Sequence, residues 1–164
     1  MKKIMETSRR AEIYLTKSSA QTKKLGEFFA KNILKRSPTK KVIVLGLIGD
    51  LGGGKTTFLQ GFAKGLGIKE KILSPTFIIM RRFRICANSR KFADFYHIDC
   101  YRIKRPEEIL ELGFKEIISN SKNLVAVEWA GRIKKILPKN VLILKFEFIN
   151  RNTRKIVLKL INGK

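Results

Sequence analysis

With 164 residues, the chain has the length of one domain, which is too short for a motor protein with accessory domains. Lysine and arginine outnumber aspartate and glutamate by 36 to 13, and the net charge of +23 favours a polyanionic partner, with a solvated basic surface as the plainer alternative. No apolar run is long enough to span a bilayer, and Cys86 and Cys100 are the only cysteines, so we expect a cytoplasmic protein with no membrane contact, disulfide or thiolate metal site.

The first half of the chain predicts alternating strands and helices. Period-two alternation and a nearly continuous apolar run indicate two strands, and apolar positions on one helical face indicate the helices that follow them. The expected elements are a loose basic tail over 1–10, a strand over 12–16, a helix that Ser18 or Ser19 caps and that ends before Pro38, a buried strand over 41–49, and a helix from Lys55 to Leu66.

The second half predicts further strands with one helix among them, and residues 11–164 contain no repeat or linker that would divide them into two domains. The expected elements are strands over 76–85 and 92–103 joined by a hairpin-like insertion over 86–91, a helix over 107–118 opened by Pro106, a buried strand over 124–129, and closing strands over 141–146 and 154–160 around a turn at 150–153.

A glycine-rich run, GDLGGGKTT, lies between the second strand and the second helix. Gly49, Gly54, Lys55 and Thr56 satisfy the P-loop pattern G-x-x-x-x-G-K-[ST], and the flanking strand and helix favour a P-loop over a flexible linker. Lys55 should reach the β- and γ-phosphates, Thr56 should ligate Mg²⁺, and Thr57 should face the α-phosphate side. The predicted phosphate-binding residues are Gly49, Asp50, Leu51, Gly52, Gly53, Gly54, Lys55, Thr56 and Thr57.

These features together predict an α/β fold of the P-loop NTPase kind, in which helices flank a central, largely parallel mixed sheet. Ligands of open α/β sheets bind at the carboxyl ends of the strands, where the glycine-rich run is expected to lie. The sequence therefore predicts a site for a nucleotide and Mg²⁺ at that edge.

Two acids compete to complete this site. Glu128 follows four apolar residues and is the better Walker B candidate, while Asp99 would lie at the same edge if the two strands are neighbours. For each acid, a surface or helix-capping carboxylate is the alternative. His97, the only histidine, favours packing or a main-chain hydrogen bond over catalysis, and Trp129 is either a core residue or an aromatic face for a ligand or partner.

Five segments in this order resemble the TsaE (formerly YjeE) family over roughly residues 12–160. They are GDLGGGKTTFLQGFAKGLG, SPTF, HIDCYRI, EEILELGF and VAVEWA. The resemblance implies a Mg²⁺-dependent ATPase that acts with the TsaB and TsaD proteins to make threonylcarbamoyladenosine next to the anticodon of tRNA. It also implies that hydrolysis is weak without these partners, and direct contact with tRNA stays open.

Site residues carry over by motif position. The resemblance implies that the loop 49–57 binds the ATP phosphates, that Thr56 and Glu128 ligate Mg²⁺, and that Asp99 supports hydrolysis. Thr76 of SPTF and Trp129 match positions tied to function, as a γ-phosphate switch or a partner contact. Departures from the family are Gly53 in place of alanine and Cys100 and Ile103 in place of leucines, and the match is poor around Ser19 and Thr22, where the family approaches the nucleotide base.

Two alternatives remain open. A small P-loop kinase could use Arg81, Arg82 and Arg84 to clamp an acceptor phosphate, and a basic RNA-binding module could use ATP only as a regulator. A GTPase is disfavoured because the chain contains no N-K-x-D motif for reading guanine.

Overall fold

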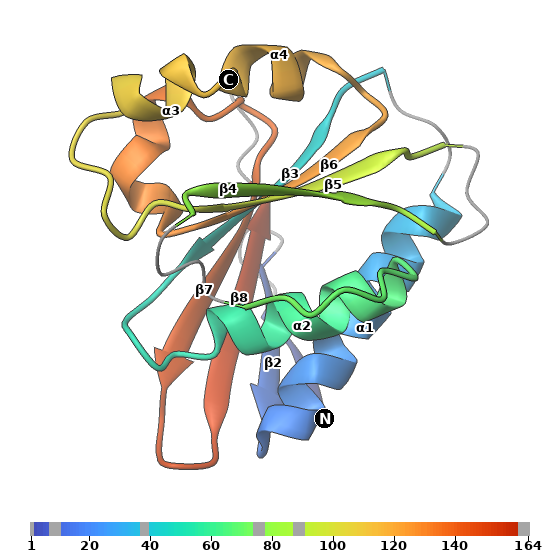
Figure 1. Ribbon diagram of the computed structural model, residues 1–164. Coiled ribbons are helices and arrows are strands. Elements are labelled where there is room, and N and C mark those ends of the chain that lie inside the picture. Colours follow the sequence, from blue (N-terminus) through green and yellow to red (C-terminus); the bar gives the residue numbers. More distant parts are fainter. Residues whose placement is uncertain (1, 7–10, 37–39, 74–77, 87–90, 161–164) are drawn as a thin grey trace.

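The computed structural model describes residues 2–6, 11–36, 40–73, 78–86 and 91–160. These residues form an eight-stranded sheet in the order β1-β2-β8-β7-β3-β6-β5-β4 (Figure 1). The strands are β1 (Lys2–Glu6), β2 (Ala11–Thr16), β3 (Ile43–Ile48), β4 (Met80–Arg84), β5 (Asp94–Asp99), β6 (Asn123–Glu128), β7 (Leu142–Phe148) and β8 (Arg154–Leu160). The helices are α1 (Ser19–Lys35), α2 (Lys55–Gly65), α3 (Glu107–Glu111), α4 (Phe114–Ser119) and the 3₁₀ helix η1 (Ala130–Ile136).

Parallel pairing is confined to four adjacent strands of the sheet, β7, β3, β6 and β5. Strand β3 pairs in parallel with β6 and β7, and β6 pairs in parallel with β5, while the remaining neighbours are antiparallel. The antiparallel pairs β1–β2, β4–β5 and β7–β8 each join consecutive strands, which short connections can join only in antiparallel order. The predicted α/β class with a mixed sheet flanked by helices is thus confirmed, with the parallel part limited to these four strands.

Helices cover both faces of the sheet (Figure 1). Helices α1 and α2 lie on one face, where Phe29 and Phe58 meet edge to face with ring centroids 5.6 Å apart. Helices α3, α4 and η1 lie on the other. Strand β3 supplies both cores, because Leu45 and Leu47 face the α1–α2 layer and Val44 faces the opposite layer. Its nearly continuous apolar sequence follows from this burial on two sides.

Local signals fixed several element boundaries. Helix α1 begins after Ser18, whose hydroxyl oxygen accepts a hydrogen bond from the Gln21 N–H at 3.2 Å, and it ends at Lys35, as predicted. Helix α2 begins at Lys55, directly after the glycine-rich run. Among the residues that the structure describes, no helix combines the length and the apolar character that crossing a membrane requires.

Three features differ from the sequence-based expectation. Residues Lys2–Glu6, expected within a loose tail, form an edge strand whose main chain pairs with the exposed edge of β2. The helix expected over 107–118 is broken into α3 and α4, because Gly113 takes a left-handed conformation with φ 79°. The 3₁₀ helix η1 at Ala130–Ile136 was not predicted. The predicted SPTF turn at 74–77 lies outside the described residues.

Candidate phosphate-binding site

The glycine-rich run forms a tight loop between the carboxyl end of β3 and the start of α2. Gly49 has φ 139°, and a side chain there would place Cβ 2.3 Å from the Phe146 carbonyl oxygen on β7, so only glycine fits. Within the loop, the Gly53 N–H donates to the Asp50 carbonyl at 3.1 Å. Helix α2 has no side-chain cap and no acidic residue in its first turn, which leaves its N-terminal amides and positive dipole end available to an anion.

Lys55 folds back over this loop. Its Nζ donates to the carbonyl oxygens of Gly49 and Asp50, both at 2.8 Å, and lies 4.2 Å from the ring centroid of Trp129. Only 5% of the residue is exposed. Burial lowers the pKa of the Lys55 ammonium, and this effect outweighs the attraction of Glu128, which raises it. The lysine is therefore a partly desolvated cation, whose attraction to an incoming phosphate is stronger than it would be in water.

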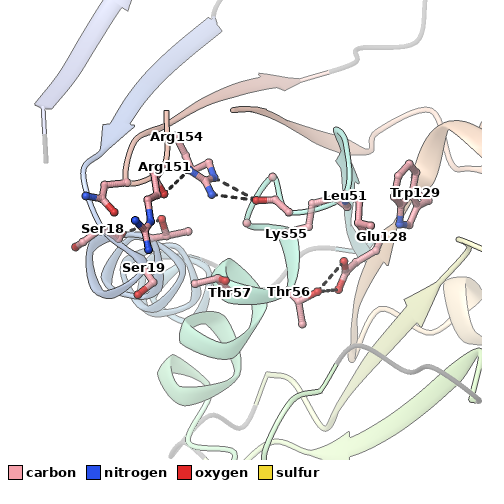
Figure 2. A pocket seen from close by; sticks show the side chains of 15 residues that line it. Ser18, Ser19, Leu51, Lys55, Thr56, Thr57, Glu128, Trp129, Arg151 and Arg154 are labelled. Atoms are coloured by element: carbon pink, nitrogen blue, oxygen red, sulfur yellow. Dashed lines mark hydrogen bonds between the residues drawn. The ribbon is translucent and has the colours of Figure 1, made fainter. Parts of the chain in front are cut away.

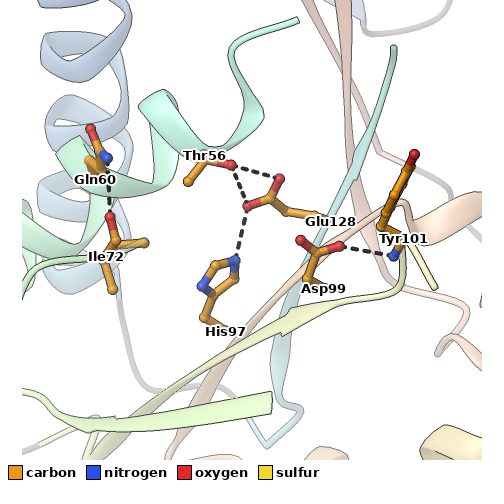
Figure 3. Close-up of polar contacts among 7 residues, drawn as sticks. All are labelled: Thr56, Gln60, Ile72, His97, Asp99, Tyr101 and Glu128. Carbon is orange, nitrogen blue, oxygen red and sulfur yellow. Dashed lines mark hydrogen bonds and ion pairs between the residues drawn. The ribbon is translucent and has the colours of Figure 1, made fainter. Parts of the chain in front are cut away.

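Thr56, in the first turn of α2, contacts Glu128 at the end of β6 (Figure 3). The Thr56 hydroxyl lies 3.0 Å from both carboxylate oxygens of Glu128, which is 2% exposed at the end of β6. The fully buried His97 places Nε2 3.0 Å from Oε1 of the same carboxylate, and its Nδ1 has no hydrogen-bond partner among the described residues. His97 thus bonds to a predicted site residue, where the sequence favoured packing or a main-chain hydrogen bond.

Asp99 lies beside Glu128. The two acids end neighbouring parallel strands and are directly opposite each other in the β5–β6 register, which brings together the two competing acids of the sequence (Figure 3). Asp99 is 8% exposed, and its Oδ1 accepts a hydrogen bond from the Tyr101 N–H at 2.9 Å. This contact fixes the carboxylate at the strand end. Both acids therefore face the same edge of the sheet as Thr56.

Trp129 lines the site and also packs against the core on the face of α3, α4 and η1. It is the only non-glycine residue of the described chain with a positive φ, at 57°, a backbone strain of the kind that concentrates at functional sites. This turn places the half-buried indole under the Lys55 ammonium and 5.1 Å from the Tyr101 ring. Both features that the sequence left open, core packing and an aromatic face at the cavity, are thus present.

A cavity of about 400 Å³ runs along the loop (Figure 2). Most of the predicted phosphate-binding residues line it, together with Glu128 and Trp129, whereas Gly49 and Asp50 do not line it and accept hydrogen bonds from Lys55. The wall opposite Glu128 comes from the start of α1, where the resemblance had placed the approach to the nucleotide base around Ser19 and Thr22, and from the β7–β8 hairpin, which the sequence did not single out as a site. These residues are Ser18, Ser19, Thr22, Arg151, Asn152 and Arg154. Thr76, the predicted switch residue, lies outside the described residues.

Comparison with known proteins identifies the family to which this architecture belongs. The sequence model of the family described as threonylcarbamoyl adenosine biosynthesis protein TsaE matches residues 16–156. The chain belongs to the TsaE family. The TsaE family functions in tRNA threonylcarbamoyladenosine biosynthesis, so the resemblance noted in the sequence is confirmed.

Relatives in the TsaE family align with most of the chain. The tRNA threonylcarbamoyladenosine biosynthesis protein TsaE of Rickettsia prowazekii is 37% identical over 138 residues, which cover 84% of this chain and 87% of the relative. The protein of the same name from Bacillus subtilis is 36% identical over 121 residues, or 74% and 72% of the two chains. The crystal structure of Bacillus subtilis YdiB superposes with a TM-score of 0.73 at 28% identity and covers 96% of this chain and 90% of that one.

Proposed function

We propose that this TsaE-family chain is a Mg²⁺-dependent P-loop ATPase that acts with TsaB and TsaD in the cytoplasm to modify tRNA. One observation carries the proposal: the Thr56 hydroxyl and the Glu128 carboxylate converge at 3.0 Å beside the buried ammonium of Lys55. In P-loop NTPases, residues of these three types hold the metal and the terminal phosphates. A structural salt bridge or a solvated surface would not require this arrangement around a glycine loop.

ATP binding would use the loop and Lys55. The amides at the start of α2 would donate to the phosphates, and Lys55 would exchange its bonds to the carbonyls of Gly49 and Asp50 for bonds to the β- and γ-phosphates. Both carbonyls lie in the loop itself, so the ammonium has to move little to do so. Desolvation of the lysine strengthens these charge-assisted bonds.

The oxygen set at Thr56 and Glu128 fits Mg²⁺. Hydroxyl and carboxylate oxygens are hard ligands, and Mg²⁺ in nucleotide sites takes few protein ligands, with waters and phosphates supplying the rest. When bound, Mg²⁺ would neutralise charge on the β- and γ-phosphates. His97 would keep the Glu128 carboxylate turned toward Thr56.

Hydrolysis would depend on Asp99 and on the partners. Asp99 lies next to Glu128, where its carboxylate can orient the attacking water. Among the described cavity-lining residues, Lys55 is the only cation on the Glu128 side, since both arginines lie on the opposite wall (Figure 2). A P-loop site without an arginine at the γ-phosphate hydrolyses slowly until a second protein supplies the missing group. We therefore propose weak hydrolysis alone and faster hydrolysis with TsaB and TsaD.

The kinase alternative gains no support from the arginines of β4. Arg82 forms an ion pair with Asp94 at 2.9 Å, and Arg84 lies opposite Asp94 in the register, at the end of β5 away from Asp99. Neither they nor Arg81 line the cavity that the described residues form. The net charge of +23 agrees with tRNA contact within a complex, although the RNA-binding alternative needs its own test.

The deciding experiment is an ATPase assay on the purified chain with and without TsaB and TsaD. We expect Mg²⁺-dependent phosphate release that the partners accelerate, and a loss of at least about 100-fold for Lys55→Ala and Glu128→Gln. Glu70→Gln, at an exposed acid, is the matched control and should behave like wild type. A phosphorylated small molecule in place of free phosphate would favour the kinase, and salt-dependent tRNA binding without hydrolysis would favour the RNA-binding module.

A further inference from the structure

The β7–β8 hairpin carries an arginine to the phosphate loop. Phe148 and Arg154 face each other as the last pair of this hairpin before its turn. The turn is built by Asn150, whose side-chain oxygen accepts hydrogen bonds from the N–H groups of Asn152 at 3.1 Å and Thr153 at 2.9 Å. Arg154, the first residue of β8, therefore follows a turn of defined geometry, and residues that position a ligand commonly stand on such rigid elements.

The guanidinium of Arg154 donates hydrogen bonds to the glycine-rich loop. Nε and Nη2 donate to the Gly52 carbonyl at 3.3 and 3.1 Å, Nη1 donates to the Asn150 carbonyl at 2.8 Å, and the group lies 4.5 Å from the Phe148 ring centroid (Figure 2). Lys55 holds the carbonyls of the loop at residues 49 and 50 in the same way. Two cations thus hold three carbonyl groups of one short loop.

The charge of Arg154 is not compensated by these contacts. Its hydrogen bonds within the described chain all go to main-chain carbonyls, and none of the ion pairs found there includes it. The guanidinium also lies close to the N-terminal end of α2, because a Cβ on Gly54 would be 4.0 Å from Arg154 Nε. A helix N-terminus is itself positive. An anion at this point would therefore be attracted by both groups at once.

The position of Arg154 indicates which phosphate it would meet. Thr56, Glu128 and Trp129 lie at one side of the loop, and Arg154 lies at the other with Ser18 and Ser19 (Figure 2). In P-loop sites the Lys and Thr mark the metal and γ-phosphate end, while the glycine amides hold the α- and β-phosphates. The Arg154 side is thus the α-phosphate end of the cavity.

We infer that Arg154 is a nucleotide ligand, which holds the Gly52 carbonyl in the empty loop and contributes its charge to the α- and β-phosphates of bound ATP or ADP. This inference rests on the proposed function, because it requires that the cavity binds a nucleotide. It adds a basic residue from the end of the chain to a site that the P-loop motif alone does not complete. It also assigns Arg154 to binding and not to the hydrolysis step.

Calorimetric titration with ADP and with ATP, in the presence of Mg²⁺, tests this assignment. Arg154→Gln retains a neutral donor for Gly52 but removes the charge, and Arg154→Lys retains the charge without the planar fork. We expect Arg154→Gln to weaken ADP and ATP binding by the same factor, about tenfold, and Arg154→Lys to stay within about threefold of wild type. Arg84→Gln, an exposed arginine at the far end of β4, makes the matched charge change and should not alter affinity.

Each contrary result has a distinct meaning. Wild-type affinity in Arg154→Gln would overturn the inference while leaving the ATPase proposal intact. Loss of ATP binding without loss of ADP binding would place Arg154 at the γ-phosphate and contradict the α-phosphate assignment. An equal loss in the Lys and Gln variants would show that the fork on Gly52 matters and the charge does not. Failure of the wild-type chain to bind either nucleotide would overturn the proposed function itself.

Discussion

The substitution Gly49→Ala tests whether the loop geometry is set by its contact with β7. Alanine at φ 139° enters a region that side chains rarely adopt, at a cost of about 1–3 kcal/mol. Its Cβ would also lie 2.3 Å from the Phe146 carbonyl oxygen, so that the loop or β7 must shift, at a further cost of about 1–3 kcal/mol. We expect a total loss of about 4 kcal/mol in the free energy of unfolding.

Gly52→Ala is the matched control within the same loop. Gly52 also has a positive φ, at 73°, but no atom lies within 4 Å of a Cβ built there, so that only the backbone term of about 1–2 kcal/mol applies. In a domain of this size, 1 kcal/mol shifts the unfolding midpoint by about 2–4 °C. Thermal unfolding should therefore show a drop of about 8–16 °C for Gly49→Ala and a few degrees for Gly52→Ala. Equal midpoints for the two variants would refute the role assigned to the Phe146 contact.

Three further predictions follow from burial and charge at the site. Glu128→Gln should retain its folded circular dichroism spectrum, because the amide oxygen still accepts from Thr56, yet it should lose the Mg²⁺ dependence of ATP binding in calorimetry. Since burial lowers the folded-state pKa of Lys55, the unfolded chain binds that proton more tightly than the folded chain does. In urea unfolding, the free energy of unfolding of wild type should therefore rise relative to that of Lys55→Met as pH increases from about 8 toward 10.5. A fall of wild type relative to Lys55→Met over this range would contradict the lowered pKa. Burial raises the pKa of the Cys100 thiol to about 12, so a thiol reagent at about pH 8 should label Cys86 alone until the chain unfolds.

Local sequence patterns predicted much of this fold because the forces behind them are local. The G-x-x-x-x-G-K-T spacing, the Ser18 cap and the continuous apolar run of β3 each depend on residues a few positions apart. Asp99 and Glu128 could be named as candidate acids from the ends of their strands, and only the β5–β6 pairing made them neighbours. Helix 107–118 was mispredicted because the left-handed conformation of Gly113 outweighed the apolar periodicity around it.

The hairpin part of the second wall, with Arg154, and the contact of His97 with Glu128 could not be predicted in this way. Arg154 contacts Gly52 across 102 positions of sequence, and His97 contacts Glu128 across 31, so no periodicity or motif links either pair. Basic residues are also frequent in this chain, with 36 lysines and arginines, and one more arginine at a strand start carries no signal. The positive φ of Trp129 likewise accompanies tertiary contacts, with Lys55 and Tyr101, that no local pattern encodes.

The most direct test of the central claim is tRNA modification reconstituted from this chain, TsaB, TsaD, ATP, Mg²⁺, tRNA and a source of the threonylcarbamoyl group, followed over many turnovers. Phosphate release and threonylcarbamoyladenosine in the tRNA are measured together for wild type and for Lys55→Ala, with Glu70→Gln as the control. We predict that wild type and the control support both, and that Lys55→Ala supports neither. Undiminished modification with Lys55→Ala would contradict the account, because the site around the phosphate loop would then have no part in the reaction.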